Sequence, residues 1–158
     1  MENNTTVIKF VSSGILAIFT AWFGTIGPLI CLLLICMIGD YITGLINAGI
    51  SGTISSVKGL KGIVKKMLYM VAVCVGMCID WLLLYLSSTF NINVPVTTFF
   101  GALVAVWLII NELTSILENI SSYVPLPAFL SKILEKAKDT VEDVGNTQAD
   151  NTNDKIKK

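Results

Sequence analysis

Three long stretches of this chain are apolar enough to cross a membrane, and two of them enclose a single carboxylate. Residues 10–39 contain no charged residue at all. The charged residue of 67–86 is Asp80, and that of 96–117 is Glu112. About 20 apolar residues cross a bilayer core of roughly 30 Å, and an ionisable group inside such a span costs at least about 2.5–3.5 kcal/mol. The pattern therefore predicts a membrane protein whose function involves these carboxylates.

The composition favours a membrane protein over a soluble domain. Hydrophobic residues make up 54% of the 158 residues, and the mean hydropathy is +0.76. A soluble domain would show amphipathic stripes or alternation instead of near-continuous apolar runs. The net charge of zero gives no indication of nucleic-acid binding, so we expect no nucleic-acid partner. We predict an all-α integral membrane protein.

The predicted organisation has four parts, divided by changes in composition. They are an N-terminal hydrophobic helix (1–26), a region of three transmembrane helices (27–117, with spans 29–48, 67–86 and 96–117), a cytoplasmic amphipathic helix (118–144) and a disordered polar tail (145–158). Gly24, Gly27 and Pro28 interrupt the first apolar stretch, since Pro cannot continue a helix interior. Residues 7–24 leave two alternatives. They form a fourth span, with the N-terminus in the cytoplasm, or an interfacial or re-entrant helix, with the N-terminus outside.

Lysines between the first two spans predict which side of the membrane each loop occupies. Lys58, Lys61, Lys65 and Lys66 have no acidic residue among them, whereas the loop 87–95 carries no charge. The positive-inside rule then places the lysine loop and the C-terminus in the cytoplasm. The same basic loop can bind anionic lipids at the membrane surface.

Glu112 lies on a small and polar face of the third span. At seven-residue steps that face also carries Thr98, Ala105 and Asn119, and Ser115 flanks it. Asn111, next to Glu112 in the sequence, is included in the predicted pore or oligomer face. Such a face turns away from lipid, toward another helix or a water-filled cavity. It indicates a surface that faces a pore or another subunit. The alternative is a seam within one subunit, in which Glu112 pairs with Lys65 or Lys66.

The other two carboxylates of the predicted pore or oligomer face have different expected partners. Asp80 has no cation at its depth, and burial without a partner favours the neutral form of a carboxyl group. That form would donate a hydrogen bond to another subunit or, alternatively, within its own subunit, so we expect Asp80→Asn to preserve function. Asp40 ends the first span and is expected to form an ion pair with Lys58 or Lys61.

The amphipathic helix near the C-terminus has a polar face of mixed charge. Its apolar residues recur at helical spacing from Phe129 to Val144, and lysines alternate with acidic residues between them. A strongly basic polar face would favour the membrane surface. Mixed signs leave two placements open, the membrane surface or a sister subunit.

No pattern typical of an enzyme, a cofactor site or a metal site occurs in the sequence. It has no His and no Arg, and neither a glycine-rich phosphate loop nor a nucleophile elbow. The four cysteines lie in apolar segments, where cysteine behaves as a small apolar residue. We therefore expect no catalytic, cofactor-binding or metal-binding residue.

Four segments, in their order along the chain, resemble the toxin-secretion and phage-lysis holins (bacteriophage holin family 4, clostridial toxin-release type). They are 40–44 (DYITG), 55–66 (SSVKGLKGIVKK), 111–119 (NELTSILEN) and 125–130 (PLPAFL) with the amphipathic helix that follows. The resemblance implies a homo-oligomer that accumulates in the bacterial cytoplasmic membrane as a multi-pass protein and opens lesions. A murein hydrolase (endolysin), or a toxin without a signal peptide, would leave through them without binding directly. The resemblance also implies no enzymatic activity, and an anti-holin as a further partner.

Two other functions fit the same residues. A small non-lethal ion channel or transporter subunit would share the spans and the carboxylates, although the chain lacks the internal repeat that many transporters show. An anti-holin or membrane scaffold would insert and oligomerise without conducting.

Overall fold

The computed structural model describes residues 2–90 and 98–156, and within these every regular element is a helix. The helices are α1 (Glu2–Phe23), the 3₁₀ turn η1 (Gly24–Ile26), α2 (Gly27–Ile50), α3 (Ser56–Phe90), α4 (Phe99–Ser121) and α5 (Ala128–Ile156). Among the described residues, α2, α3 and α4 are long and apolar enough to cross a membrane. The predicted all-α class with three candidate spans is confirmed. The two placements of the N-terminal helix stay predictions.

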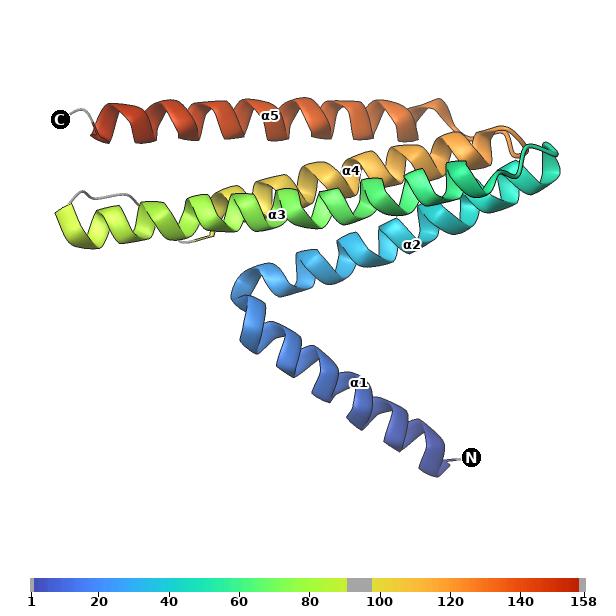
Figure 1. Cartoon of the computed structure of the whole chain (residues 1–158), viewed down its shortest axis with the longest axis horizontal. Coiled ribbons are helices and arrows are strands. Elements are labelled where there is room, and N and C mark those ends of the chain that lie inside the picture. The colour runs from blue at the N-terminus through green and yellow to red at the C-terminus, as the bar shows by residue number, and fades with distance from the viewer. Residues whose placement is uncertain (1, 91–97, 157–158) are drawn as a thin grey trace.

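A glycine turn separates α1 from the rest of the fold. Gly24 has a φ of +55°, a conformation that glycine adopts without steric cost, and Pro28 lies in the first turn of α2, where its missing N–H costs no helical hydrogen bond. The chain therefore changes direction here, and α1 points away from the other helices (Figure 1). The predicted break at 24–28 is confirmed.

Helix α4 packs against α2, α3 and α5. Its fully buried Ala105 lies in one apolar core with Leu33 of α2 and Val73 of α3. Gly76 of α3 and Gly101 of α4 lie close together, since an added Cβ on Gly76 would lie 2.9 Å from the Cα of Gly101. Small residues thus let the α3 and α4 backbones nearly touch, as in other membrane helix pairs.

Helix α3 is longer at its N-terminal end than the sequence indicates. The glycines and serines of 49–59 predict a loop, but α2 continues to Ile50 and α3 begins at Ser56. No proline interrupts this stretch, and one glycine at a helix end costs only about 1 kcal/mol relative to alanine. All four clustered lysines, at 58, 61, 65 and 66, therefore lie in the first turns of one continuous helix. The connection 91–97, with Val96, lies outside the described residues.

Helix α5 also extends beyond its predicted end. The sequence predicts a helix to about residue 144 and a disordered tail, yet α5 continues to Ile156. No proline follows Pro127, and α5 lies along α4 of the same chain, a placement that neither sequence alternative includes. Its C-terminal end lies where α3 ends, opposite to the lysine-bearing end (Figure 1). The contact with α4 explains why a segment of polar composition stays helical.

Candidate functional site

Lys66 joins three helices through two carboxylates. Its Nζ donates to Asp40 Oδ2 of α2 at 2.8 Å and also to Glu112 Oε2 of α4. Glu112 is only 2% exposed, and all three side chains are largely excluded from solvent. The predicted alternative of a seam within one subunit is what this chain forms, with Lys66 as the partner of Glu112.

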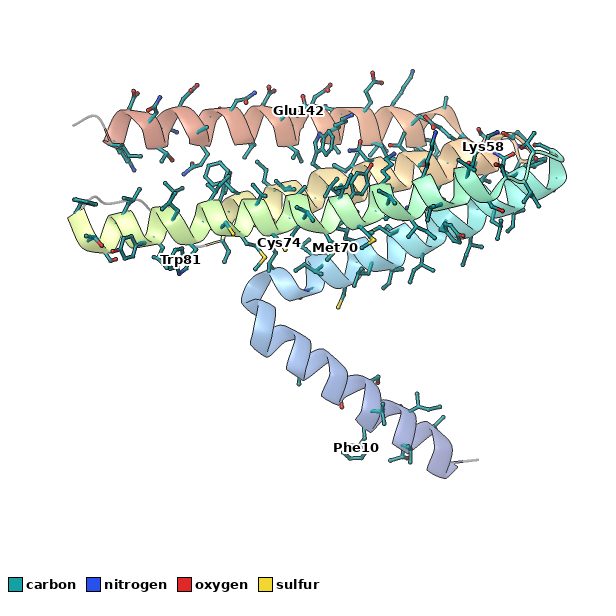
Figure 2. The ribbon with its side chains drawn as sticks, in the orientation of Figure 1. Phe10, Lys58, Met70, Cys74, Trp81 and Glu142 are labelled. Carbon is teal, nitrogen blue, oxygen red and sulfur yellow. The ribbon has the colours of Figure 1, made fainter. Side chains whose placement is uncertain are left out.

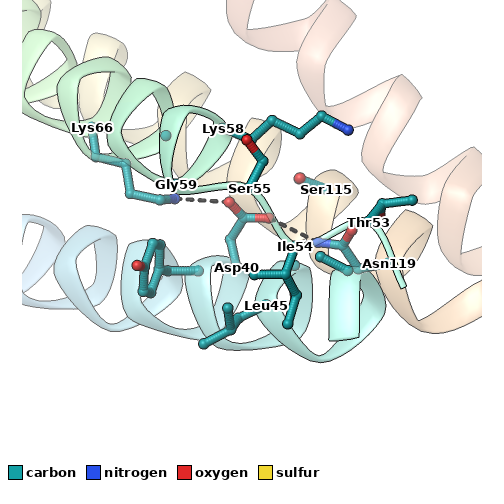
Figure 3. Close-up of a pocket in the computed structure, with 14 residues that line it drawn as sticks. Asp40, Leu45, Thr53, Ile54, Ser55, Lys58, Gly59, Lys66, Ser115 and Asn119 are labelled. Atoms are coloured by element: carbon teal, nitrogen blue, oxygen red, sulfur yellow. Dashed lines mark hydrogen bonds and ion pairs between the residues drawn. The ribbon is translucent and has the colours of Figure 1, made fainter. Parts of the chain in front are cut away.

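The expected partners of Asp40 are wrong. Sequence reasoning paired Asp40 with Lys58 or Lys61, whereas its partner is Lys66. Lys58 and Lys61 are exposed, and the Lys58 ammonium extends away from Asp40 (Figure 3). The reason is helical register. Lys66 lies five residues after Lys61 and eight after Lys58, on the face of α3 that meets α2 and α4.

A ladder of amide and hydroxyl groups extends this charge network toward the lysine-bearing end. Asn119 Nδ2 donates to Asp40 Oδ1 at 3.2 Å and lies 3.3 Å from Thr43 Oγ1, and its Oδ1 accepts from Asn47 at 3.4 Å. Tyr123 Oη then donates to Asn47 Oδ1 at 2.9 Å. Sequence reasoning missed Asn47 and Tyr123. The signal was available for Asn47, because 40, 43 and 47 share one face of a helix.

A pocket of about 330 Å³ lies beside this network (Figure 3). It is lined by α2, α3, α4 and the 51–55 connection, and its polar lining includes Asp40, Thr53, Ser55, Ser115 and Asn119. Asp40 and its partner Lys66 therefore both line this pocket.

Asp80 lies at the N-terminal end of α4, away from the Lys66 network. It is 4% exposed, and it accepts from the backbone N–H groups of the first three residues of α4. The distances are 3.1 Å from Phe99 and 2.8 Å from Phe100 to Oδ1, and 2.8 Å from Gly101 to Oδ2. The hydrogen bonds of Asp80 thus lie within its own chain, which was the second of the two expected placements, but Asp80 accepts them instead of donating. The first N–H groups of a helix lack intrahelical partners, and the helix dipole favours an anion beside them.

The remaining residues of the predicted pore or oligomer face have different surroundings. Ala105 is fully buried in the core, Asn111 and Ser115 are half-buried, and Thr98 is exposed immediately before α4. A single chain does not test whether any of them faces another subunit, so that role stays a prediction. The same holds for lipid binding by the lysines, of which Lys58, Lys61 and Lys65 are exposed.

Comparison with known proteins places these residues within one matched region. The model of a family described as the bacteriophage holin family matches residues 17–139. This region includes the Lys66 charge network and all three candidate spans. It also includes the Asp80 cap, meaning the hydrogen bonds between Asp80 and the first three N–H groups of α4.

Similar proteins occur in several bacteria. An uncharacterized 14.9 kDa protein of Clostridium perfringens, from the nagH 3′ region, is 36% identical over 138 residues, covering 86% of this chain and 96% of the relative. An uncharacterized protein of Listeria monocytogenes is 36% identical over 113 residues (72% and 73%). One of Halalkalibacterium halodurans is 33% identical over 129 residues (81% and 91%). No solved structure matches.

We expect Lys66→Met to destabilise the helix bundle strongly. Methionine keeps most of the side-chain length but leaves two buried carboxylates without a cation, and removing one partner of a buried ion pair costs about 3–5 kcal/mol. Denaturation of the purified protein in detergent micelles measures the free energy of unfolding. Lys61→Met, at an exposed position of the same helix, should change it little. Equal losses in the two variants would show that the network does not hold the helices together.

The Asp80 cap makes a prediction opposite to the expectation from sequence. Asp80→Asn loses at least one of the three N–H bonds, because an amide nitrogen does not accept. Hydrogen bonds to charged groups contribute about 1.5–3 kcal/mol each, so the free energy of unfolding in micelles should fall by at least about 1.5 kcal/mol. The free energy of unfolding should fall further in Asp80→Ala, because this variant loses all three hydrogen bonds. An asparagine variant as stable as the original chain would contradict the cap.

Proposed function

This chain belongs to the bacteriophage holin family, and we propose that it acts as a holin. In this proposal the chain oligomerises in the bacterial cytoplasmic membrane and opens lesions. Through them a murein hydrolase, or a toxin without a signal peptide, leaves the cell without binding directly. The observation that carries the proposal is the family match over all three candidate spans. Its other partners are lipids and an anti-holin, and we propose no enzymatic activity.

The first requirement of a holin is harmless accumulation, and the side chains of the bundle suit it. Large apolar side chains are exposed along α2 and α3, as lipid contact requires. They include Leu32, Ile35, Ile38, Leu68, Val71 and Val75. The two buried carboxylates are satisfied within the chain, Glu112 by Lys66 and Asp80 by the start of α4. Pairing of this kind lowers the free-energy cost of ionisable groups in a bilayer. A single subunit can therefore insert without a second subunit or water to satisfy its carboxylates.

The second requirement is that subunits gather, and here the half-buried flank of α4 supports the proposal. Asn111 and Ser115 lie beside Glu112 without being enclosed in the core. Polar and small residues at such positions favour contacts between membrane helices that are individually weak. We propose that these residues and Thr98 contribute to the subunit face, while Asp40, Asp80 and Glu112 hold each subunit together.

The orientation in the membrane follows from the lysines. The network, the pocket and Lys58, Lys61 and Lys65 all lie at the end of the bundle that holds the 51–55 connection. We propose that this end faces the cytoplasm, in accordance with the positive-inside rule. Anionic headgroups there would add to the attraction.

Inducible expression in a bacterium tests the proposed function. Cultures express the chain, a cytosolic murein hydrolase, or both, and culture density and membrane potential are followed over time. We expect abrupt depolarisation at a reproducible time whenever the chain is present, and lysis only when the hydrolase is also present. Continued growth with the chain in the membrane would contradict the holin and support an anti-holin or scaffold. A gradual, non-lethal conductance would support the channel alternative.

A further inference from the structure

Helix α5 is too highly charged for lipid, yet it lies along a candidate membrane span. Its 29 residues extend about 43 Å at 1.5 Å per residue, which exceeds a bilayer core of roughly 30 Å. The charged residues of α5 are Lys132, Glu135, Lys136, Lys138, Asp139, Glu142, Asp143, Asp150, Asp154 and Lys155. Oxygen- and nitrogen-tipped side chains follow the side of α5 that faces away from the bundle (Figure 2).

The contact between α5 and α4 lies within the α4 span. Trp107 Nε1 donates to Glu142 Oε1 at 3.0 Å, and Lys138 Nζ lies 5.0 Å from the centroid of the Trp107 ring. Further along, a Cβ added to Gly145 would lie 2.7 Å from Leu103 Cδ2. Both α4 residues belong to Phe99–Ser121, the span that would cross the bilayer. The charged middle of α5 therefore lies at membrane depth in this arrangement.

Water must cover the outer face of α5 where it lies at this depth. Asp139 and Asp143 are exposed there, and acidic groups of this kind are rare against lipid because they are costly to dehydrate. The side of α5 that meets α4 carries Lys138, Val141, Glu142 and Gly145. One side of the helix therefore lies on protein, and the opposite side, with Asp139 and Asp143, requires water. An intact bilayer offers no water at this depth, whereas a lesion does.

The connection between α4 and α5 contains two prolines and lies outside the Lys66 network. Tyr123 is fixed to α2 through Asn47, but the residues immediately after it, Val124 and Pro125, are exposed. Pro125 and Pro127 have no N–H to fix this connection in a helix. Helix α5 can therefore leave α4 without disturbing the Lys66 network.

We propose that α5 lies outside the bilayer before the lesion opens and lies along α4 afterwards, so that its charged face lines the water-filled lesion. This inference rests on the proposed function, since it requires a lesion. It assigns the water-facing surface to α5 rather than to the small and polar face of α4, where Glu112 is paired with Lys66 of the same chain.

A disulfide between α4 and α5 tests the proposal. The variant carries Leu103→Cys and Gly145→Cys, a pair in which the smaller residue at 103 makes room for the new side chain at 145. The matched control carries Leu103→Cys and Asp143→Cys, with the second cysteine on the outer face of α5. Cells expressing each variant are treated briefly with a copper–phenanthroline oxidant and then with N-ethylmaleimide, before and after depolarisation. Mass spectrometry measures the linked peptides, and each single-cysteine variant gives the background from the native cysteines.

We expect the 103–145 disulfide within one chain to rise above background at depolarisation, and the 103–143 control to stay at background. The same disulfide in fully polarised cells would overturn the proposal, because α5 would then lie along α4 without a lesion. Depolarisation without the disulfide would also overturn it, while leaving the proposed function intact. A chain that inserts but never depolarises the cell would overturn both the proposed function and this inference.

Discussion

The lysine that two carboxylates share is the interaction on which the rest of the structure depends. Lys66 of α3 connects Asp40 of α2 with Glu112 of α4, so one cation fixes the mutual position of all three candidate spans. The hydrophobic effect gives helices in lipid little preference for one register, because lipid tails are as apolar as leucine. A buried ion pair does give such a preference, since any other register leaves a charge without a partner.

Polar contacts at both ends of α4 explain why it is the central helix. At its start, the Asp80 carboxylate accepts three backbone N–H groups, and toward its end Asn119 joins Asp40. Helix α5 differs, because its contact with α4 depends on Trp107 and Gly145 rather than on a buried charge. A firmly joined three-helix unit and a separable charged helix suit a protein that first inserts quietly and later admits water.

Sequence reasoning found the features that depend on local pattern. The three spans, the break at Gly24 and the resemblance to holins all follow from apolar length, glycine and proline chemistry, and short motifs. The partners of the carboxylates depend on how distant helices meet. Asp80 was expected to be a neutral donor because no cation lies near it in the sequence, but the N-terminus of α4 supplies three donors. The extent of α5 was missed because composition alone does not reveal a contact with α4.

The most direct test of this account compares Lys66→Met with a triple variant in which Asp40→Asn and Glu112→Gln accompany Lys66→Met. The measurement is the amount of protein in the membrane and the time of depolarisation after matched induction. If unpaired buried charge is what the network prevents, Lys66→Met should accumulate poorly or depolarise the membrane early, and the uncharged triple variant should recover toward the original chain. A triple variant as impaired as Lys66→Met, or a Lys66→Met that behaves as the original chain, would contradict the account.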